Sequence, residues 1–338
     1  MKSIVFDNYG PPEVLRYIDA EKPVPEDGEV LVKVHASSVN FNNLTFVIGK
    51  PYFARFWTGL TKPKVRTPGN DIAGTVESAG GNVTMFKPGD EVYGDIFSCG
   101  YGAYSEYVSV PESMIAFKPK NISFEEAATV PEAAKVALQA LRDGGKIEAG
   151  MNVLIYGAAG GIGTFAVQIA KSYGAEVTGV CGTRNMDMVR SIGADHVIDY
   201  TTEDFTKNGR SYDLIVATAG YRSIFDYKRA LSPHGIYVAT GGSMKGPNSM
   251  KQIFQPMLLG PWISRKGGKK LSAWSAKLSR EDLDVLGKLI EAGKVKPVID
   301  RTYLLSRTAD AFRYYAEGHA NGKIVIRMEH ELSGVNAG

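Results

Sequence analysis

The sequence predicts an α/β protein of two domains, one with short strands in a barrel-like arrangement and one with a doubly wound parallel sheet. Three observations support this prediction: the chain length, a change in hydrophobic pattern near Asn121, and a glycine-rich turn between a strand and a helix. The 338 residues exceed what a single hydrophobic core ordinarily organises. We therefore treat residues 1–122 and 123–275 as separate domains.

The first domain is expected to consist of short β segments. Residues 29–35 alternate apolar and polar side chains, and residues 72–77 and 91–93 behave similarly. Proline, glycine and aspartate cluster between such segments, as at 87–90, which is typical of turns. The pattern predicts an antiparallel, barrel-like domain.

The second domain alternates strands with helices. Ser123 and Glu126 form a capping-box pattern that opens an alanine-rich helical run. A helix is expected at 162–173, and a capped amphipathic helix is expected beyond this domain at 279–292. The expected strands of the sheet are 153–156, 176–180, 196–199, 213–216 and 235–238. Strands that alternate with helices predict a parallel, doubly wound sheet.

Composition and charge argue against several classes of function. The net charge of +3 gives no indication of nucleic-acid binding, and no apolar run reaches the roughly 18 residues of a membrane-spanning helix. The N-terminus lacks the apolar core of a secretory signal, and Cys99 and Cys181 are too few for a disulfide framework. We expect a cytoplasmic protein without stable membrane insertion and without a nucleic-acid partner.

The strongest chemical signal is the glycine-rich segment 157–163, which directly follows an expected strand and opens an expected helix. Glycines there let the backbone turn tightly and approach a pyrophosphate, and the free N–H groups of the helix N-terminus face its negative charge. The segment predicts a dinucleotide cofactor. The residues expected to bind it are Ala158, Gly160, Gly161, Ile162 and Gly163.

The end of the second strand indicates which nucleotide is bound. An NAD enzyme ordinarily places an acid there for the ribose 2′-hydroxyl, but here no acid occurs between Val180 and Asp187. Thr183 and Arg184 occupy the position instead, and an arginine suits a 2′-phosphate because its planar fork donates two parallel hydrogen bonds. Tyr200 is expected to wall the same pocket, with simple packing as the alternative. We predict NADPH/NADP rather than NADH.

Two further strand ends are expected at the ligand-binding edge of the sheet. Small residues there would let the backbone lie against ribose and nicotinamide, although ordinary turns are the alternative interpretation. The residues concerned are Ala219, Gly220, Gly241, Gly242 and Ser243.

The ordered set of motifs resembles the medium-chain dehydrogenase/reductase superfamily from Met1 to about Met328. The matching segments are 9–15, 38–41, 68–76, 86–92, 157–163 and 192–200. The resemblance implies a GroES-like catalytic domain, a Rossmann domain, and a return of the chain to the first domain over about 276–338. It also implies a homodimer.

The resemblance places the catalytic zinc ligands of alcohol dehydrogenases on Asn40, Asn70 and Glu132. Carboxamides are poor ligands for Zn²⁺, which prefers thiolate, imidazole and carboxylate. We therefore expect no metal. Without a Lewis acid, the favoured acceptors are a quinone or an α,β-unsaturated carbonyl, whose charge delocalises onto oxygen after hydride addition.

The resemblance to quinone oxidoreductases assigns further candidates. Asn40 is expected beside the nicotinamide and the substrate, with a turn-forming asparagine as the alternative. Tyr52 is a candidate donor to a substrate oxygen, with a packing role as the alternative. Val136 stands where relatives commonly have threonine near the nicotinamide. Glu132 either pairs with Lys135 or is a proton donor with a raised pKa.

Other functions stay open beside the reductase. A zinc-free alcohol or aldehyde dehydrogenase and an NADPH-binding protein with little activity are compatible with the same motifs. The apolar segment 254–262 belongs to a region that often borders the substrate cleft or the dimer interface. The basic run at 265–270 beside it is ordinarily a solvated loop, and its contact with a membrane or a partner is left open.

Overall fold

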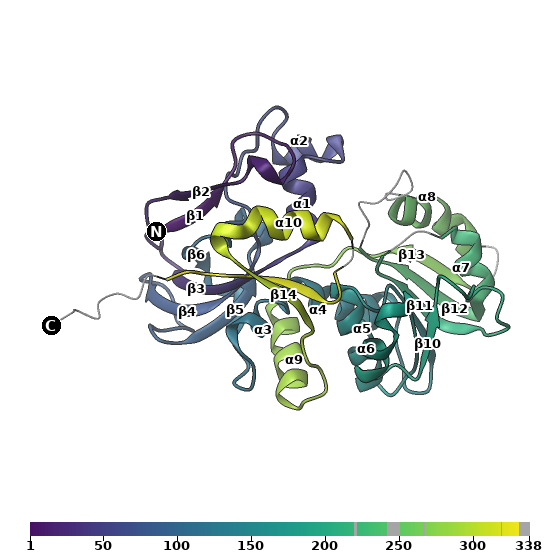
Figure 1. Ribbon diagram of the computed structural model, residues 1–338. Helices are drawn as coiled ribbons and strands as arrows, with labels where there is room; N and C mark the ends of the chain where they lie inside the picture. Colours follow the sequence, from purple (N-terminus) through teal and green to yellow (C-terminus); the bar gives the residue numbers. More distant parts are fainter. Residues whose placement is uncertain (220–221, 242–250, 266–267, 319, 331–338) are drawn as a thin grey trace.

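The computed structural model describes residues 1–219, 222–241, 251–265, 268–318 and 320–330. Figure 1 shows two lobes with helix α4 (Pro131–Gln139) between them. The described strands form a seven-stranded sheet in one lobe, a six-stranded parallel sheet in the other, and a two-stranded hairpin. The predicted α/β fold class is confirmed.

The first lobe is organised around strand β3 (Glu29–Val39), which is longer than the expected 29–35. One edge of β3 pairs with β4, while its other edge pairs first with β6 and then with β15. Register shifts near Val32 and Val34 bend the strand, and the bend lets it serve two partners in turn. Asn40 follows β3 directly and caps helix α1 (Phe41–Ile48).

The remaining elements of this lobe are mostly short. The strands are β1 (Lys2–Val5), β2 (Arg16–Asp19), β4 (Asp71–Ala79), β5 (Glu91–Asp95), β6 (Tyr107–Pro111), β7 (Ile115–Phe117), β14 (Ile299–Leu304) and β15 (Lys323–Arg327). The helices and helical turns are η1 (Pro12–Val14), η2 (Tyr52–Ala54), α2 (Arg55–Thr58), η3 (Phe97–Cys99), η4 (Glu112–Met114), α3 (Phe124–Ala127), η7 (Leu305–Arg307) and α10 (Thr308–Ala316).

The second lobe is a parallel sheet in the order β10-β9-β8-β11-β12-β13. Its strands are β8 (Asn152–Tyr156), β9 (Glu176–Cys181), β10 (His196–Asp199), β11 (Tyr212–Ala217), β12 (Leu231–Ala239) and β13 (Lys270–Ala273). The order reverses between β8 and β11, which is where open α/β sheets bind ligands. The helical elements are α4, η5 (Ala140–Gly144), α5 (Gly161–Ser172), η6 (Thr183–Asn185), α6 (Met186–Ser191), α7 (Ile224–Ala230), α8 (Lys251–Arg265) and α9 (Arg280–Glu291).

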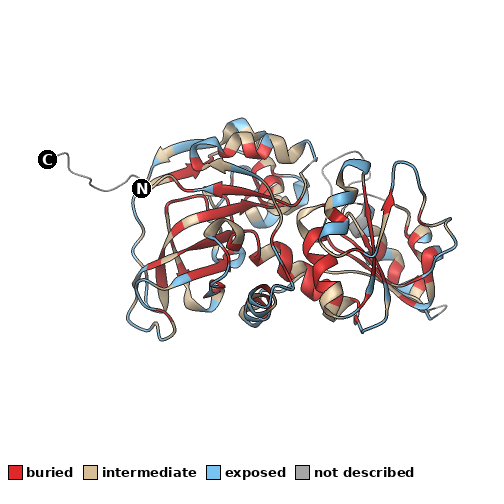
Figure 2. Cartoon of the chain, turned by 60° about the horizontal axis from the view of Figure 1, so that its bottom comes forward, coloured by how far each residue is buried: buried red, intermediate tan, exposed pale blue. Residues whose placement is uncertain are grey.

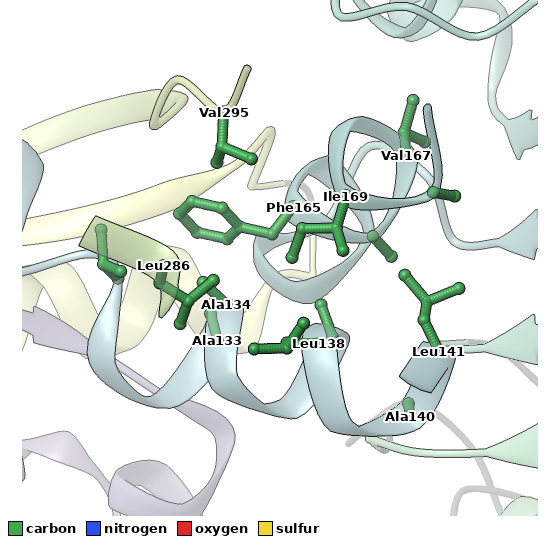
Figure 3. Packing of buried hydrophobic residues seen from close by; sticks show 14 of the residues in the cluster. Ala133, Ala134, Leu138, Ala140, Leu141, Phe165, Val167, Ile169, Leu286 and Val295 are labelled. Carbon is green, nitrogen blue, oxygen red and sulfur yellow. The ribbon is translucent and has the colours of Figure 1, made fainter. Parts of the chain in front are cut away.

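A core of small and branched side chains holds the helices between the lobes. Figure 3 shows Phe165 and Ile169 of α5 beside Ala134 and Leu138 of α4, with Leu286 of α9 beyond them. Alanine on α4 lets the helices approach closely, because it adds little bulk at their contact. Figure 2 shows that buried residues also fill the strands of both sheets.

The last part of the chain returns to the first lobe. Strand β15 pairs with β3, and β14 pairs with β15. Just before β15, the Gly322 N–H donates to the Ala159 carbonyl oxygen at 2.8 Å, which ties the returning segment to the glycine-rich turn. In the part of the chain that the structure describes, no helix is long and apolar enough to cross a membrane.

Candidate nucleotide-binding and active site

The glycine-rich turn between β8 and α5 has the backbone that a bound pyrophosphate needs. Gly157 adopts a φ of 87°, where an L side chain is strained, and a Cβ there would lie 2.8 Å from the Thr218 hydroxyl oxygen. A Cβ on Gly163 would overlap with the Gly157 carbonyl oxygen. Gly160 caps α5, and its Cβ direction is open apart from one carbonyl at 3.5 Å. This open cradle at a helix N-terminus fits a pyrophosphate.

A pocket of about 670 Å³ extends from this turn along the ends of β9 and β10. Thr183, Arg184 and Tyr200, all expected at the nucleotide, line it. The Tyr200 hydroxyl would lie 3.4 Å from a Cβ on Gly182, so the tyrosine covers the end of β9. The sequence-predicted residues of this end of the site therefore come together in one pocket.

Asp199 is an acid directly behind this pocket, and the sequence analysis did not predict it there. Its carboxylate accepts a hydrogen bond from the Thr183 hydroxyl, and the Thr201 N–H donates to it at 2.9 Å. These hydrogen bonds lower the pKa of Asp199, and the bond from Thr183 has the largest effect. The acid of NAD enzymes is expected at the end of β9, whereas Asp199 ends the adjacent strand β10. Because Thr183 donates to Asp199, its hydroxyl hydrogen is not directed at a nucleotide phosphate.

A second cavity, of about 190 Å³, lies between the two lobes and shares Gly160 and Ala219 with the first pocket. Seven expected residues line it: Asn40, Glu132, Gly160, Gly161, Ile162, Ala219 and Gly241. It also includes Lys323, which was not expected. The two pockets together form a path from the end of β9 to Asn40.

Several expected residues lie outside these walls. Tyr52 is an exposed residue of η2 whose ring faces the Arg55 guanidinium at 4.9 Å. Val136, Ala158 and Gly163 belong to helices or turns behind the cavity and do not line it. Gly220, Gly242 and Ser243 lie outside the described residues.

The three positions that resemble zinc ligands come together as a network of hydrogen bonds. The Asn40 carboxamide donates to Asn70 at 3.3 Å, and the Asn70 carboxamide donates to Glu132 Oε2 at 2.9 Å. Asn42 also donates to Glu132 Oε2, at 2.9 Å. Two of the three positions are carboxamides, which are poor zinc donors, and in the described residues no three His, Cys, Asp or Glu side chains are arranged so that they could hold a metal ion. The donor set does not fit a catalytic zinc.

Five charged groups lie in or beside this network. Asp71, Asp95 and Glu132 supply three carboxyls, and Lys135 and Lys323 supply two ammonium groups. Lys135 pairs with Asp95 at 2.6 Å, and Lys323 lies 3.6 Å from Asp71. Charges balance in this low-dielectric region when one carboxyl carries a proton.

Glu132 is the carboxyl that meets the cavity. Burial, followed by the neighbouring Asp71 and Asp95, raises its pKa to about 8. Burial raises the pKa of Asp71 as well, although Lys323 and the hydrogen bonds from Asn40 and Ser38 oppose this. Both donors to Glu132 use Oε2, so the described contacts leave Oε1 for a ligand or for the proton.

Lys323 is a charged side chain of the cavity that the sequence did not predict there. It begins β15, it is 3% exposed, and its ammonium donates to the Asn40 carboxamide oxygen. A Cβ on Gly161 would lie 2.9 Å from Lys323 Cδ, so the lysine stem lies against the glycine-rich turn of the other lobe. A lysine at the start of a strand is usually exposed, whereas here β15 lies between β3 and β14 and the stem of Lys323 lies against Gly161.

Comparison with known proteins shows the family of this chain. Residues 26–120 match the alcohol dehydrogenase GroES-like domain, and residues 192–326 match a domain described as zinc-binding dehydrogenase. A chloroplastic quinone-oxidoreductase of Triphysaria versicolor is 32% identical over 340 residues, which cover 96% of this chain and 98% of that protein. The chain belongs to the medium-chain dehydrogenase/reductase superfamily.

Its quinone oxidoreductase-like relatives include enzymes named for other acceptors. A 2-methylene-furan-3-one reductase of Solanum lycopersicum is 32% identical and covers 96% of this chain and 79% of its own length. The solved quinone oxidoreductase of Coxiella burnetii superimposes with a TM-score of 0.83 at 29% identity, covering 97% and 99% of the two chains. As a medium-chain dehydrogenase/reductase, the protein is an oxidoreductase with a nicotinamide cofactor and a small-molecule substrate.

Proposed function

We propose that the protein is a zinc-independent, NADPH-dependent reductase of quinones or α,β-unsaturated carbonyl compounds. One observation carries the proposal. The cavity between the lobes places the Lys323 ammonium, the Glu132 carboxyl and the glycine-rich turn around one space. Quinone and enone reduction uses a cofactor site, a group that stabilises the developing oxyanion and a proton source, and these residues supply one of each.

The residues around the two pockets have distinct roles toward the cofactor. The N-terminus of α5, at Gly160 and Gly161, holds the pyrophosphate. Arg184 and Tyr200 hold the 2′-phosphate, and Ala219 and Gly241 leave space for the nicotinamide half. When bound, the reduced nicotinamide supplies a hydride.

Lys323 stabilises the acceptor oxygen. The Asn40 carboxamide was expected to donate to this oxygen, but its nitrogen already donates to Asn70 and Asp71. Its oxygen accepts from Lys323, so we assign Asn40 the role of positioning the ammonium. A buried ammonium stabilises a nearby oxyanion strongly, since little water screens it.

Glu132 delivers the proton. With one proton on the cluster, two aspartates balance two lysines, and the proton on Glu132 faces the cavity. A carboxyl with a pKa near 8 stays protonated at neutral pH and can act as a general acid. A quinone takes up this proton on oxygen, and an enone takes it up on the α-carbon.

A substrate panel tests the proposal. Protein dialysed against a chelator should oxidise NADPH steadily with soluble quinones and enones, and more slowly with NADH. Alcohol-dependent reduction of NADP⁺ without quinone or enone turnover would favour the zinc-free dehydrogenase. Tight NADPH binding without turnover across the panel would instead indicate a binding protein.

Two further proposals concern the cellular location and the oligomeric state. We propose that the protein acts in the cytoplasm and forms a homodimer. Some relatives are named as chloroplastic or mitochondrial, so the location is specific to each family member. Sedimentation of the purified protein measures its oligomeric state.

A further inference from the structure

An apolar and basic face spans the junction of the two lobes, and neither the cofactor site nor the acceptor site uses it. It consists of residues 50–66, which contain η2 and α2, together with α8 and Lys270. We refer to this surface as the basic aromatic face. Ring contact between Phe53 and Phe254, with centroids 6.1 Å apart, joins the two segments. Figure 1 shows α2 and α8 along the same side of the molecule, with α9 on the opposite side.

Large apolar side chains of this face are exposed to solvent. Trp57 is 73% exposed on α2, and Leu258 is 75% exposed on α8. Further exposed members are Phe53, Phe56, Leu60, Phe254, Met257 and Trp262. A soluble protein ordinarily exposes such residues singly, whereas a contiguous patch marks an interaction surface.

Helix α8 has two apolar sides. Its buried side includes Pro256, Gly260 and Ile263, and a Cβ on Gly260 would overlap with the Leu271 carbonyl oxygen of β13. The helix therefore packs tightly against the edge of the sheet. The outward side repeats at helical spacing, with exposed residues at 254, 257, 258, 261 and 262. Met257 and Leu258 of this stripe are more than half exposed, while the Phe254 ring contacts Phe53.

The charges of the face have one sign. Segment 50–66 contains five basic residues and no acid, and α8 together with Lys270 contains three basic residues and no acid. Within the described residues, Lys50, Arg55, Lys62 and Lys64 form no ion pair with a carboxylate. Arg66 alone of the first segment does so, with Asp7. The partner of this face therefore has negative charge beside an apolar layer.

From this combination we propose that the basic aromatic face docks on an anionic lipid surface. Tryptophan and other aromatic side chains partition into the boundary between headgroups and acyl chains, and lysine and arginine attract anionic headgroups. A second copy of the chain fits less well. A two-fold contact would place the same basic patch against itself, and like charges would repel.

Vesicle co-sedimentation tests the docking. The probes are vesicles of phosphatidylcholine alone and vesicles of equal parts phosphatidylcholine and phosphatidylserine. The full-length protein should bind only the second kind, and added salt should weaken binding. The variant Lys62→Glu/Lys64→Glu should bind at least about 30-fold more weakly, since each basic residue near the surface contributes roughly a fivefold gain.

Matched variants distinguish an effect of this face from an effect of net charge or of exposed apolar residues elsewhere. Lys288→Glu/Lys294→Glu makes the same change in net charge at the far side, around α9, and should retain binding. Trp57→Ser/Leu258→Ser should lose roughly tenfold in vesicle binding. Val24→Ser/Val285→Ser replaces exposed apolar residues elsewhere and should bind like the unmodified protein.

Activity and size measurements complete the test. NADPH oxidation with a soluble quinone should be the same for all four variants, so a failed docking result is distinct from a failed reductase proposal. Equal binding to neutral and anionic vesicles, or equal losses in the α9 variant, would overturn the proposal. So would a shift from dimer to monomer in Trp57→Ser/Leu258→Ser, which would identify the face as a contact between copies.

Discussion

At the scale of single residues, the site is a network in which few groups act alone. Asn40 holds Lys323, Asn70 links Asn40 to Glu132, and Asp71 accepts from Asn40 and from the Glu132 N–H. Substitution of one member therefore moves several others, and the informative variants are those that keep shape and change charge. Arg184 and Glu132 allow such comparisons at the two ends of the site.

Replacing Arg184 by alanine should weaken NADPH binding by about 1.5–3 kcal/mol and leave NADH binding nearly unchanged. The reason is that Arg184 lines the pocket at the end of β9, where the 2′-phosphate is expected and the Thr183 hydroxyl donates to Asp199. Titration calorimetry with both nucleotides measures the effect. Equal losses for the two nucleotides would show that Arg184 does not recognise the 2′-phosphate.

Replacing Glu132 by glutamine should lower kcat for an enone by roughly 10²-fold and remove the loss of activity near pH 8. The raised pKa means that folded Glu132 keeps its proton between the ordinary value of 4.5 and about 8, whereas the unfolded chain releases it. The stability that this proton provides is fully present below pH 4.5 and is lost as the pH rises toward 8.

The glutamine variant should therefore lose this decline in stability, which we estimate as about 1–3 kcal/mol between pH 5 and pH 8. Glutamine still accepts from Asn42 and Asn70, so the network is kept. Urea unfolding at both pH values measures the difference. The same decline in both proteins would place the proton on another group.

At the scale of elements, the helix caps and the turn that were predicted correctly depend on residues close together in the sequence. The serine caps at Ser123 and Ser279 were predicted and are confirmed, because each side chain accepts from an N–H three residues ahead. The glycine-rich turn was predicted for the same reason, since its geometry depends on adjacent residues. Helix α8 was not predicted. Pro256 and Pro261 interrupt its pattern, and packing against β13 holds it in place.

Gly163→Ala should destabilise the protein by about 1–3 kcal/mol, because its methyl group would overlap with the Gly157 carbonyl oxygen between β8 and α5. Gly160→Ala is the matched control. Its Cβ meets only one atom at 3.5 Å, so thermal stability should change little while NADPH binding weakens. Thermal unfolding of both variants compares them. Equal melting temperatures would contradict the close packing of turn and helix.

At the scale of the whole molecule, the active cavity exists because the chain returns to its first lobe. Lys323 reaches Asn40 because β15 pairs with β3, and Gly322 meets the glycine-rich turn through its hydrogen bond to Ala159. The fold class was predictable from local patterns and from the motif set, and so were many of the residues that line the two pockets. Lys323 and the Asp95–Lys135 pair were not, since sequence spacing gives no sign of contacts formed between distant segments.

The central claim is that hydride passes from NADPH to a conjugated acceptor without a metal. Transfer of deuterium tests it most directly, with chelator-treated protein, an enone, and NADPH deuterated at either face of C4 in separate reactions. We predict one deuterium on the β-carbon of the saturated product from one of the two cofactors. Product without deuterium from both cofactors, or turnover that returns only when zinc is added, would contradict the account.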